Sequence, residues 1–248
     1  MILRRLSEHV KAQNWFAVAL DFVIVVLGVF VGLQVDNWSA ERQDRIHEER
    51  FLQQLHVDLM AATSASQRLL ERRMERHDYM ISALDVLFER EGRDELTENE
   101  CQALASSAWY NLVVAELGSV NELTSSGRVG IISDSDLRAE LISLQQIINA
   151  TNRTINHFSG TGIELPHRFP RLMRSEGRFD EALGEVRLLN TCDLSGMRAN
   201  QEFLNMASTN VDSYDAYIRD AVNPWHQALV RVHASVDALL DIQHEESN

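Results

Sequence analysis

The longest apolar run in the chain lies near its start and reads WFAVALDFVIVVLGVFVGLQV. It holds one charged residue, Asp21, in 21 positions. At 1.5 Å per residue a helix of this length extends about 30 Å, which matches the hydrocarbon core of a bilayer. Trp15 and Trp38 lie about 35 Å apart on such a helix, as expected of indoles at the two membrane interfaces. The pattern predicts a transmembrane helix over 15–38, after a short basic tail over 1–14.

A cleaved signal peptide is the rival interpretation of this run. The residues that follow it, QVDNWSAERQ, contain no small-x-small cleavage site at a suitable distance, so a retained helix is favoured. No later stretch approaches 18 apolar residues. We therefore expect the chain to cross the membrane once.

The positive charges beside the span do not determine its orientation in the membrane, because three basic residues lie on each side of it. They are Arg4, Arg5 and Lys11 before the span, and Arg42, Arg45 and Arg50 after it. A short basic tail ahead of the first span usually stays in the cytoplasm, while a long following domain is translocated largely regardless of its charge. We therefore expect the N-terminus inside the cytoplasm and the C-terminal domain outside it.

One face of the predicted span combines small residues with a carboxyl group. Asp21, Val25, Gly28 and Gly32 are separated by steps of 4, 3 and 4, so they share that face. The two glycines form a GxxxG pair, which lets helix backbones approach closely, and an intramembrane carboxyl group needs a partner or a proton. These residues are the candidate transmembrane helix interface. The alternative is a chance GxxxG, with Asp21 reaching the headgroup region.

After the span, apolar positions recur at helical spacing over a long stretch without Gly or Pro, residues 39–91. We expect one long helix there, ended by Gly92. Its apolar stripe comprises Leu52, Leu55, Leu59, Ala62, Ser66 and Leu69, followed by Met80, Leu84 and Leu87.

Shorter helices follow, each with a recognisable start or stop. Thr97 and Glu100 form a capping box for a second helix that runs to about residue 117. A third is expected near 120–126, ended by Gly127.

A fourth helix is expected to begin at Ser133, with Asp136 in its first turn. Its apolar positions alternate steps of 4 and 3, as in a heptad repeat, and are Leu137, Leu141, Leu144, Ile148, Thr151, Ile155 and Phe158.

Residues 159–196 hold five of the 11 glycines and two of the three prolines, so this segment is predicted to be an irregular connector. One short helix is expected near 178–188. The last helix should run over about 197–245, with a kink at Pro224. The predicted fold is all-α: one transmembrane helix continuing into an antiparallel bundle of long helices over 39–248.

Composition and charge exclude several classes of function. The chain is 45% apolar with 3 Pro, which argues against disorder, and its formal net charge of −14 argues against binding nucleic acid. Lys11, in the tail, is the only lysine. Lysine nucleophiles and a P-loop are therefore excluded from the domain.

Two cysteines, Cys101 and Cys192, are the only thiols in the chain. In an exported domain two thiols often pair, and this pair would close a loop worth roughly 4 kcal/mol in the chain-entropy model. Sequence spacing does not show proximity, so two unpaired thiols remain the alternative.

The nine histidines indicate no metal site by their spacing. The only E-x-x-H motif, Glu164 to His167, contains Pro166, which prevents the helical geometry of di-iron bundles. His226 and His233 share a helix face but lie about 10 Å apart, too far for one ion. No G-x-S-x-G motif is present. We expect no cofactor, no metal and no enzymatic activity.

Four segments together resemble an uncharacterised bacterial family known only as a domain of unknown function. They are QNWFAV, DFVIVVLGVFVGLQVDNW, ERFLQQLHVDL and VNELTSSGRVGIISDSDLRAEL, and the resemblance covers about residues 10–160. The resemblance implies a single-pass protein of the bacterial inner membrane with a helical domain. With the orientation expected above, that domain would be periplasmic. It carries no activity, substrate or catalytic residue.

These observations favour a membrane-anchored helical interaction or structural protein, such as an accessory subunit of a larger inner-membrane complex. Its expected partners are the lipid bilayer and another membrane protein or a second copy, met through the transmembrane helix. The alternative is an extracytoplasmic ligand-sensing helical module that acts through a partner.

Overall fold

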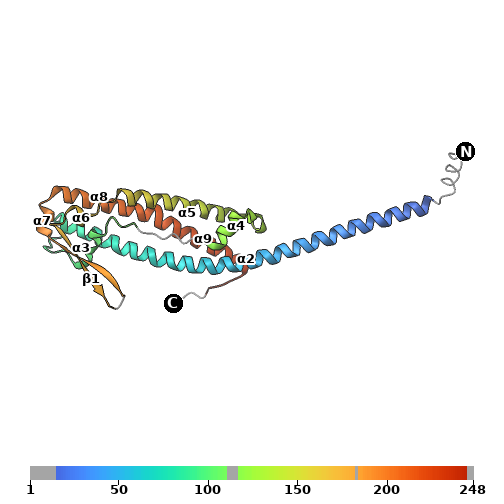
Figure 1. Ribbon diagram of the computed structural model, residues 1–248, viewed down its shortest axis with the longest axis horizontal. Coiled ribbons are helices and arrows are strands. Elements are labelled where there is room, and N and C mark those ends of the chain that lie inside the picture. Colours follow the sequence, from blue (N-terminus) through green and yellow to red (C-terminus); the bar gives the residue numbers. More distant parts are fainter. Residues whose placement is uncertain (1–14, 111–116, 182–183, 245–248) are drawn as a thin grey trace. The chain divides into compact units, whose positions relative to one another are not determined.

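The computed structural model describes residues 15–110, 117–181 and 184–244, and most of these residues are helical (Figure 1). The elements are, in chain order, α2 (Trp15–Leu87), α3 (Glu98–Ala105), α4 (Gly118–Ser125), the 3-10 helix η1 (Arg128–Ile131), α5 (Ser135–Thr161), α6 (Leu165–Arg168), β1 (Met173–Asp180), β2 (Glu185–Cys192), α7 (Leu194–Arg198), α8 (Gln201–Tyr217), the π-helix η2 (Ile218–Val222) and α9 (Asn223–Leu240). The chain divides into two compact units, Met1–Arg50 and Phe51–Asn248.

The described part of the first unit is helical throughout, and its surface is apolar from Leu20 to Val35. Every described large apolar side chain between Leu20 and Val35 is about half exposed or more. Among the described residues, one helix is long and apolar enough to cross a membrane, judged by length and composition. The tail over 1–14 lies outside the described residues.

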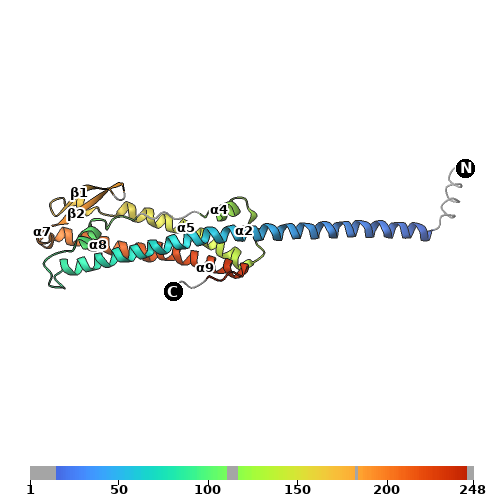
Figure 2. The same ribbon diagram turned by 90° about the horizontal axis from the view of Figure 1, so that it is seen from below.

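In the second unit, α2 packs along α8 and α9, and both ribbon views show these helices lengthwise beside one another (Figures 1 and 2). The contacts between α2 and the pair α8 and α9 run in opposite chain directions. As the residue number rises along α2, the number of its contact residue in α9 and then α8 falls. Three side-chain contacts have this order: His56 with Asp237, Ser66 with His226, and His77 with Asp215.

The apolar stripe predicted for the exit helix is the buried face of α2. Seven of its nine residues are buried, and Leu69 and Leu84 pack against the core while partly exposed. The helix ends at Leu87, a few residues before Gly92, which adopts a left-handed backbone with φ +64°. The prediction of one long helix is confirmed.

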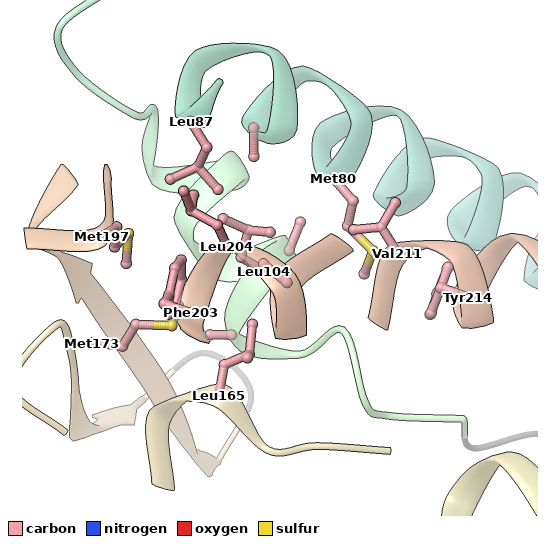
Figure 3. Packing of buried hydrophobic residues seen from close by; sticks show 14 of the residues in the cluster. Met80, Leu87, Leu104, Leu165, Met173, Met197, Phe203, Leu204, Val211 and Tyr214 are labelled. Atoms are coloured by element: carbon pink, nitrogen blue, oxygen red, sulfur yellow. The ribbon is translucent and has the colours of Figure 1, made fainter. Parts of the chain in front are cut away.

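Two apolar clusters form the core of the second unit. One lies around the end of α2, α3, α6, α7 and α8, and Figure 3 shows Met80 and Leu87 of α2 facing Leu204 and Val211 of α8 within it. The other joins the earlier turns of the same α2 segment to α4, α5 and α9, with Trp225 at its centre fully enclosed.

The capped helices begin close to where the sequence places them. Thr97 and Glu100 form the predicted capping box of α3, but that helix ends at Ala105 rather than near 117. Residues 111–116 lie outside the described part of the chain. In α5 the cap is Asp134, one residue after the predicted Ser133, and the heptad positions from Leu137 to Thr151 are buried.

The predicted last helix is divided into α7, α8, η2 and α9. Pro224 has no N–H to donate, and its ring would clash with the carbonyl of the preceding turn in a regular α-helix. The wider π turn Ile218–Val222 comes directly before Asn223 and Pro224, and it relieves that clash while the chain continues as a helix.

The expectation of a wholly α fold without strands is wrong in one region. Strands β1 and β2 form an antiparallel hairpin in which Met173 faces Cys192 and Phe179 faces Val186. The short helix expected near 178–188 is therefore replaced by this hairpin. Both strands are exposed along most of their length, so no alternation of apolar and polar residues marked them. The protein is mostly α, with one small two-stranded sheet.

Candidate functional site

Four side chains with metal-ligating groups meet where α2 passes the end of α9. His56 comes from α2, and His233 and Asp237 lie one turn apart on α9. Asp241 ends α9 in a left-handed conformation, with φ 54°, and the N–H of Ile242 bonds back to the carbonyl of Asp237. This turn returns the chain toward the helix and brings His244 to the same place. We call these four residues the histidine cluster.

Asp237 is at the centre of the histidine cluster. Its Oδ1 lies 2.8 Å from Nδ1 of His56 and 3.5 Å from Nε2 of His233, and its Oδ2 lies 2.9 Å from Nε2 of His244. One ligand atom from each residue can be chosen so that all four lie within 4.8 Å of one another.

The three imidazole rings are mutual neighbours, and each has a nitrogen near an oxygen of the carboxylate. Ring centroids are 5.2 Å apart for His56 and His233, and the ring of His244 stacks on that of His56 with an interplanar angle of 13°. The side chains of His56, His233 and Asp237 are about 15% exposed, whereas that of His244 is half exposed. The cluster is thus a shielded site with one open side.

His233 is the least satisfied member of the cluster. Its Nε2 is buried and makes no hydrogen bond within the described part of the chain. Burial lowers the pKa of His233, and the nearby Asp237 carboxylate opposes that effect in part. The nearest partner of His233 Nε2 here is Asp237 Oδ1 at 3.5 Å, too far for a good hydrogen bond, so this nitrogen is available to a ligand.

The predicted thiol pair lies at a different place in the second unit. Cys101 on α3 and Cys192 at the end of β2 are joined as a disulfide, with their Sγ atoms 2.09 Å apart. Beside it, the Asn190 amide donates a 2.8 Å hydrogen bond to the side chain of Gln102. Together these contacts fix the hairpin to α3.

A buried carboxylate lies in the same α3 region. Glu100 is 3% exposed and accepts hydrogen bonds from Arg93, from the hydroxyl of Ser82 at 2.5 Å, and from the backbone of Thr97 at 2.7 Å. Burial by itself raises the pKa of this carboxyl group, but the hydrogen bonds, led by that from Arg93, outweigh it and lower the pKa to about 2.

An open groove of about 330 Å³ lies on the polar surface between α2, α3 and β2. Its charged lining residues are three arginines, Arg72, Arg76 and Arg187, and one acid, Glu75. Guanidinium groups match carboxylate and phosphate ligands, and here they gather in a protein whose net charge is strongly negative.

The predicted membrane residues all belong to α2. Val25 and Trp38 are exposed, and a Cβ at Gly28 or Gly32 would meet nothing within 4 Å beyond the neighbouring backbone of its own helix. The side chains of Trp15 and Asp21 lie outside the described part. The association of this face with a partner remains a prediction.

The histidines considered in the sequence have other surroundings. His226 contacts the hydroxyl of Ser66 at 2.8 Å and is not part of the cluster. Glu164 and His167 form an exposed ion pair with each other at the short helix α6.

Sequence reasoning assigned none of the four cluster residues to a site; it considered His233 only with His226 and set that pair aside as too far apart for one ion. The local signal was present, since His233 and Asp237 are four residues apart and so share one helix face. His56, 181 residues from Asp237, carries no local sign of that proximity.

In comparisons with known proteins, no family model, no curated protein and no solved structure matched this chain. Its function is therefore argued from its own residues.

Proposed function

We propose that this protein is a membrane-anchored helical interaction or structural protein, an accessory subunit of a larger inner-membrane complex. The observation that carries the proposal is the exposed apolar surface of α2 between Leu20 and Val35. A continuous apolar surface of this size in a chain that otherwise builds an apolar core indicates contact with lipid or with another protein.

In this proposal the second unit is an antiparallel helical bundle in the periplasm, and the N-terminal tail is cytoplasmic. The reversed order of contacts between α2 and α8–α9 supports the antiparallel arrangement. The Cys101–Cys192 disulfide supports an oxidising compartment, because such bonds persist mainly outside the cytoplasm.

Gentle detergent extraction of the natively expressed, tagged protein, followed by native gel and mass spectrometry, tests the proposed role. We expect stoichiometric membrane-protein partners to co-migrate with it. A species that runs only as a monomer or homodimer would contradict the accessory-subunit role. Protease digestion of intact spheroplasts tests the orientation, and a domain protected until the membrane is lysed would contradict it.

The groove lined by Arg72, Arg76 and Arg187 favours a second candidate function, the sensing of a small anionic solute through a partner protein. Inorganic phosphate and a small dicarboxylate are the probes, and a rise in the melting temperature of the full chain is the readout. Arg76→Gln should abolish the rise, while Arg68→Gln, on α2 but outside the groove, should retain it. No rise with either probe would contradict this function.

A further inference from the structure

We infer that His56, His233, Asp237 and His244 form a binding site for one divalent transition-metal ion of the zinc class. This inference goes beyond the proposed membrane role and does not depend on it. All four residues belong to the second unit, and none is needed for insertion of the apolar segment of α2.

The spacing of the ligand atoms fits a tetrahedral ion. Zinc binds imidazole nitrogen and carboxylate oxygen at about 2.0–2.2 Å, which places neighbouring ligand atoms roughly 3.4 Å apart around the metal. The distances from the Asp237 oxygens to the histidine nitrogens are 2.8, 2.9 and 3.5 Å. The four ligand atoms all lie within 4.8 Å of one another, so the pair farthest apart must approach by up to about 1.4 Å to form a coordination sphere.

The chemistry of the four groups selects the class of ion. Three imidazoles and one carboxylate suit zinc and its neighbours in the late first transition series, whereas calcium and magnesium require mainly oxygen ligands. The single carboxylate charge of Asp237 leaves a divalent ion with a net charge of only +1 in a partly buried place. A metal would also give a ligand to the buried Nε2 of His233, which makes no hydrogen bond in the described structure and lies 3.5 Å from Asp237 Oδ1.

Four protein ligands around one ion define a closed, structural site rather than a catalytic one. The ion would join α2 to α9 and to the segment that follows α9, across 181 residues of chain between His56 and Asp237. Binding to the folded state alone would stabilise the second unit.

Calorimetric titration with zinc tests this inference on the full chain in detergent, stripped with chelator and carrying an affinity tag without histidine. We expect one saturable site, and an excess of magnesium or calcium should not compete with zinc. Cobalt should give the intense visible absorption of a tetrahedral centre. At a hundredfold excess of free zinc over its Kd, the melting temperature should rise by about 5 °C or more.

Variants distinguish this site from adventitious binding by surface histidines. His233→Gln and His244→Ala should each weaken zinc binding by at least tenfold. Replacing a residue that only supports a metal ligand already weakens metal binding by about that factor. His226→Gln is the matched control, because it removes an imidazole from the same helix and another contact to α2. It should bind zinc like the unaltered protein.

Circular dichroism of each variant checks that it folds. His244 lies after α9 and is half exposed, so its replacement leaves the core intact even where His233→Gln does not. Absence of a saturable site, or equal loss in the His226→Gln control, would overturn the inference. Either result would leave the proposed membrane role untouched, since that role is tested by extraction and protease protection.

Discussion

Glu100 shows how one buried side chain can link folding to pH. Its carboxylate is enclosed at the start of α3 and is held by Arg93, Ser82 and the backbone of Thr97. The pKa of about 2 lies below the ordinary value of 4.5. A carboxyl group with a lowered pKa stabilises the folded state above its ordinary pKa, and this contribution is lost as the pH falls toward its folded pKa.

Replacement of this group should therefore have an effect that depends on pH. We expect Glu100→Gln to lower the free energy of unfolding at pH 7 by about 2 kcal/mol, after allowance for solvent screening at the partly exposed Arg93. The difference from the unaltered protein should shrink as the pH falls from about 4.5 toward 2. Denaturant unfolding across this range measures it, and Glu98→Gln, exposed in the same turn, is the control. A difference independent of pH would contradict the assigned cause.

Gly162 is required by its close neighbours rather than by its backbone angles. A Cβ at this position would lie 2.9 Å from the ring of Tyr110 and 3.0 Å from the Cβ of Ala108. We expect Gly162→Ala to destabilise the fold by about 1–3 kcal/mol through overpacking. Gly160, two residues earlier in α5, has no such neighbour, and Gly160→Ala should be neutral or stabilising by up to about 1 kcal/mol. Equal thermal stability of the two variants would refute this expectation.

At the scale of the elements, the sequence predicted the long helices because their packing is periodic. In α5, Leu137, Leu141, Leu144 and Ile148 are all buried, and their spacing alone identifies one helix face. The hairpin had no such signal. Phe179 and Val186 face each other across β1 and β2 and are both exposed, so cross-strand pairing replaces burial as the determinant.

The Cys101–Cys192 disulfide is a covalent cross-link whose contribution to stability can be measured by removing it. Cys101 and Cys192 are separated by 91 positions, and closing a loop of that size stabilises by roughly 4 kcal/mol in the chain-entropy model. We expect no alkylation of the native protein without reductant and two labelled thiols after reduction and unfolding. Two free thiols before reduction would exclude the bond.

The double variant Cys101→Ser with Cys192→Ser should lose a similar free energy of unfolding, on the order of 4 kcal/mol. Reductant should lower the stability of the unaltered protein and leave that of the double variant unchanged. A loss of stability in both on addition of reductant would assign the effect to another cause.

For the whole molecule, the histidine cluster marks the limit of what one sequence can predict. His233 and Asp237 share a helix face by local spacing, but His56 is brought to them only by the tertiary packing of α2 beside α9. The reversed contact order between α2 and α9 places these residues together. Periodicity identifies each helix and its buried face, but it does not specify which turn of one helix meets which turn of another.

Self-association or docking in the membrane is the remaining prediction at this scale. We expect Gly28→Ile with Gly32→Ile to reduce the signal of a transmembrane association reporter severalfold, because the added side chains keep two backbones apart. Val23→Ile with Val26→Ile adds one methylene group at each of two positions on the opposite side of the helix and should have little effect. An unchanged signal in the glycine variant would show that this face is not an interface.

The π turn at Ile218–Val222 sets the rotation of α9 about its own axis relative to α8. Each residue advances an α-helix by about 100°. Deleting a single residue within this turn would therefore rotate α9 by that angle relative to α8, and would carry Leu229 and Val232 away from the core. The same rotation would turn His233 and Asp237 away from His56. The position of the histidine cluster therefore depends on one irregular turn earlier in the chain, and that turn contains none of the four cluster residues.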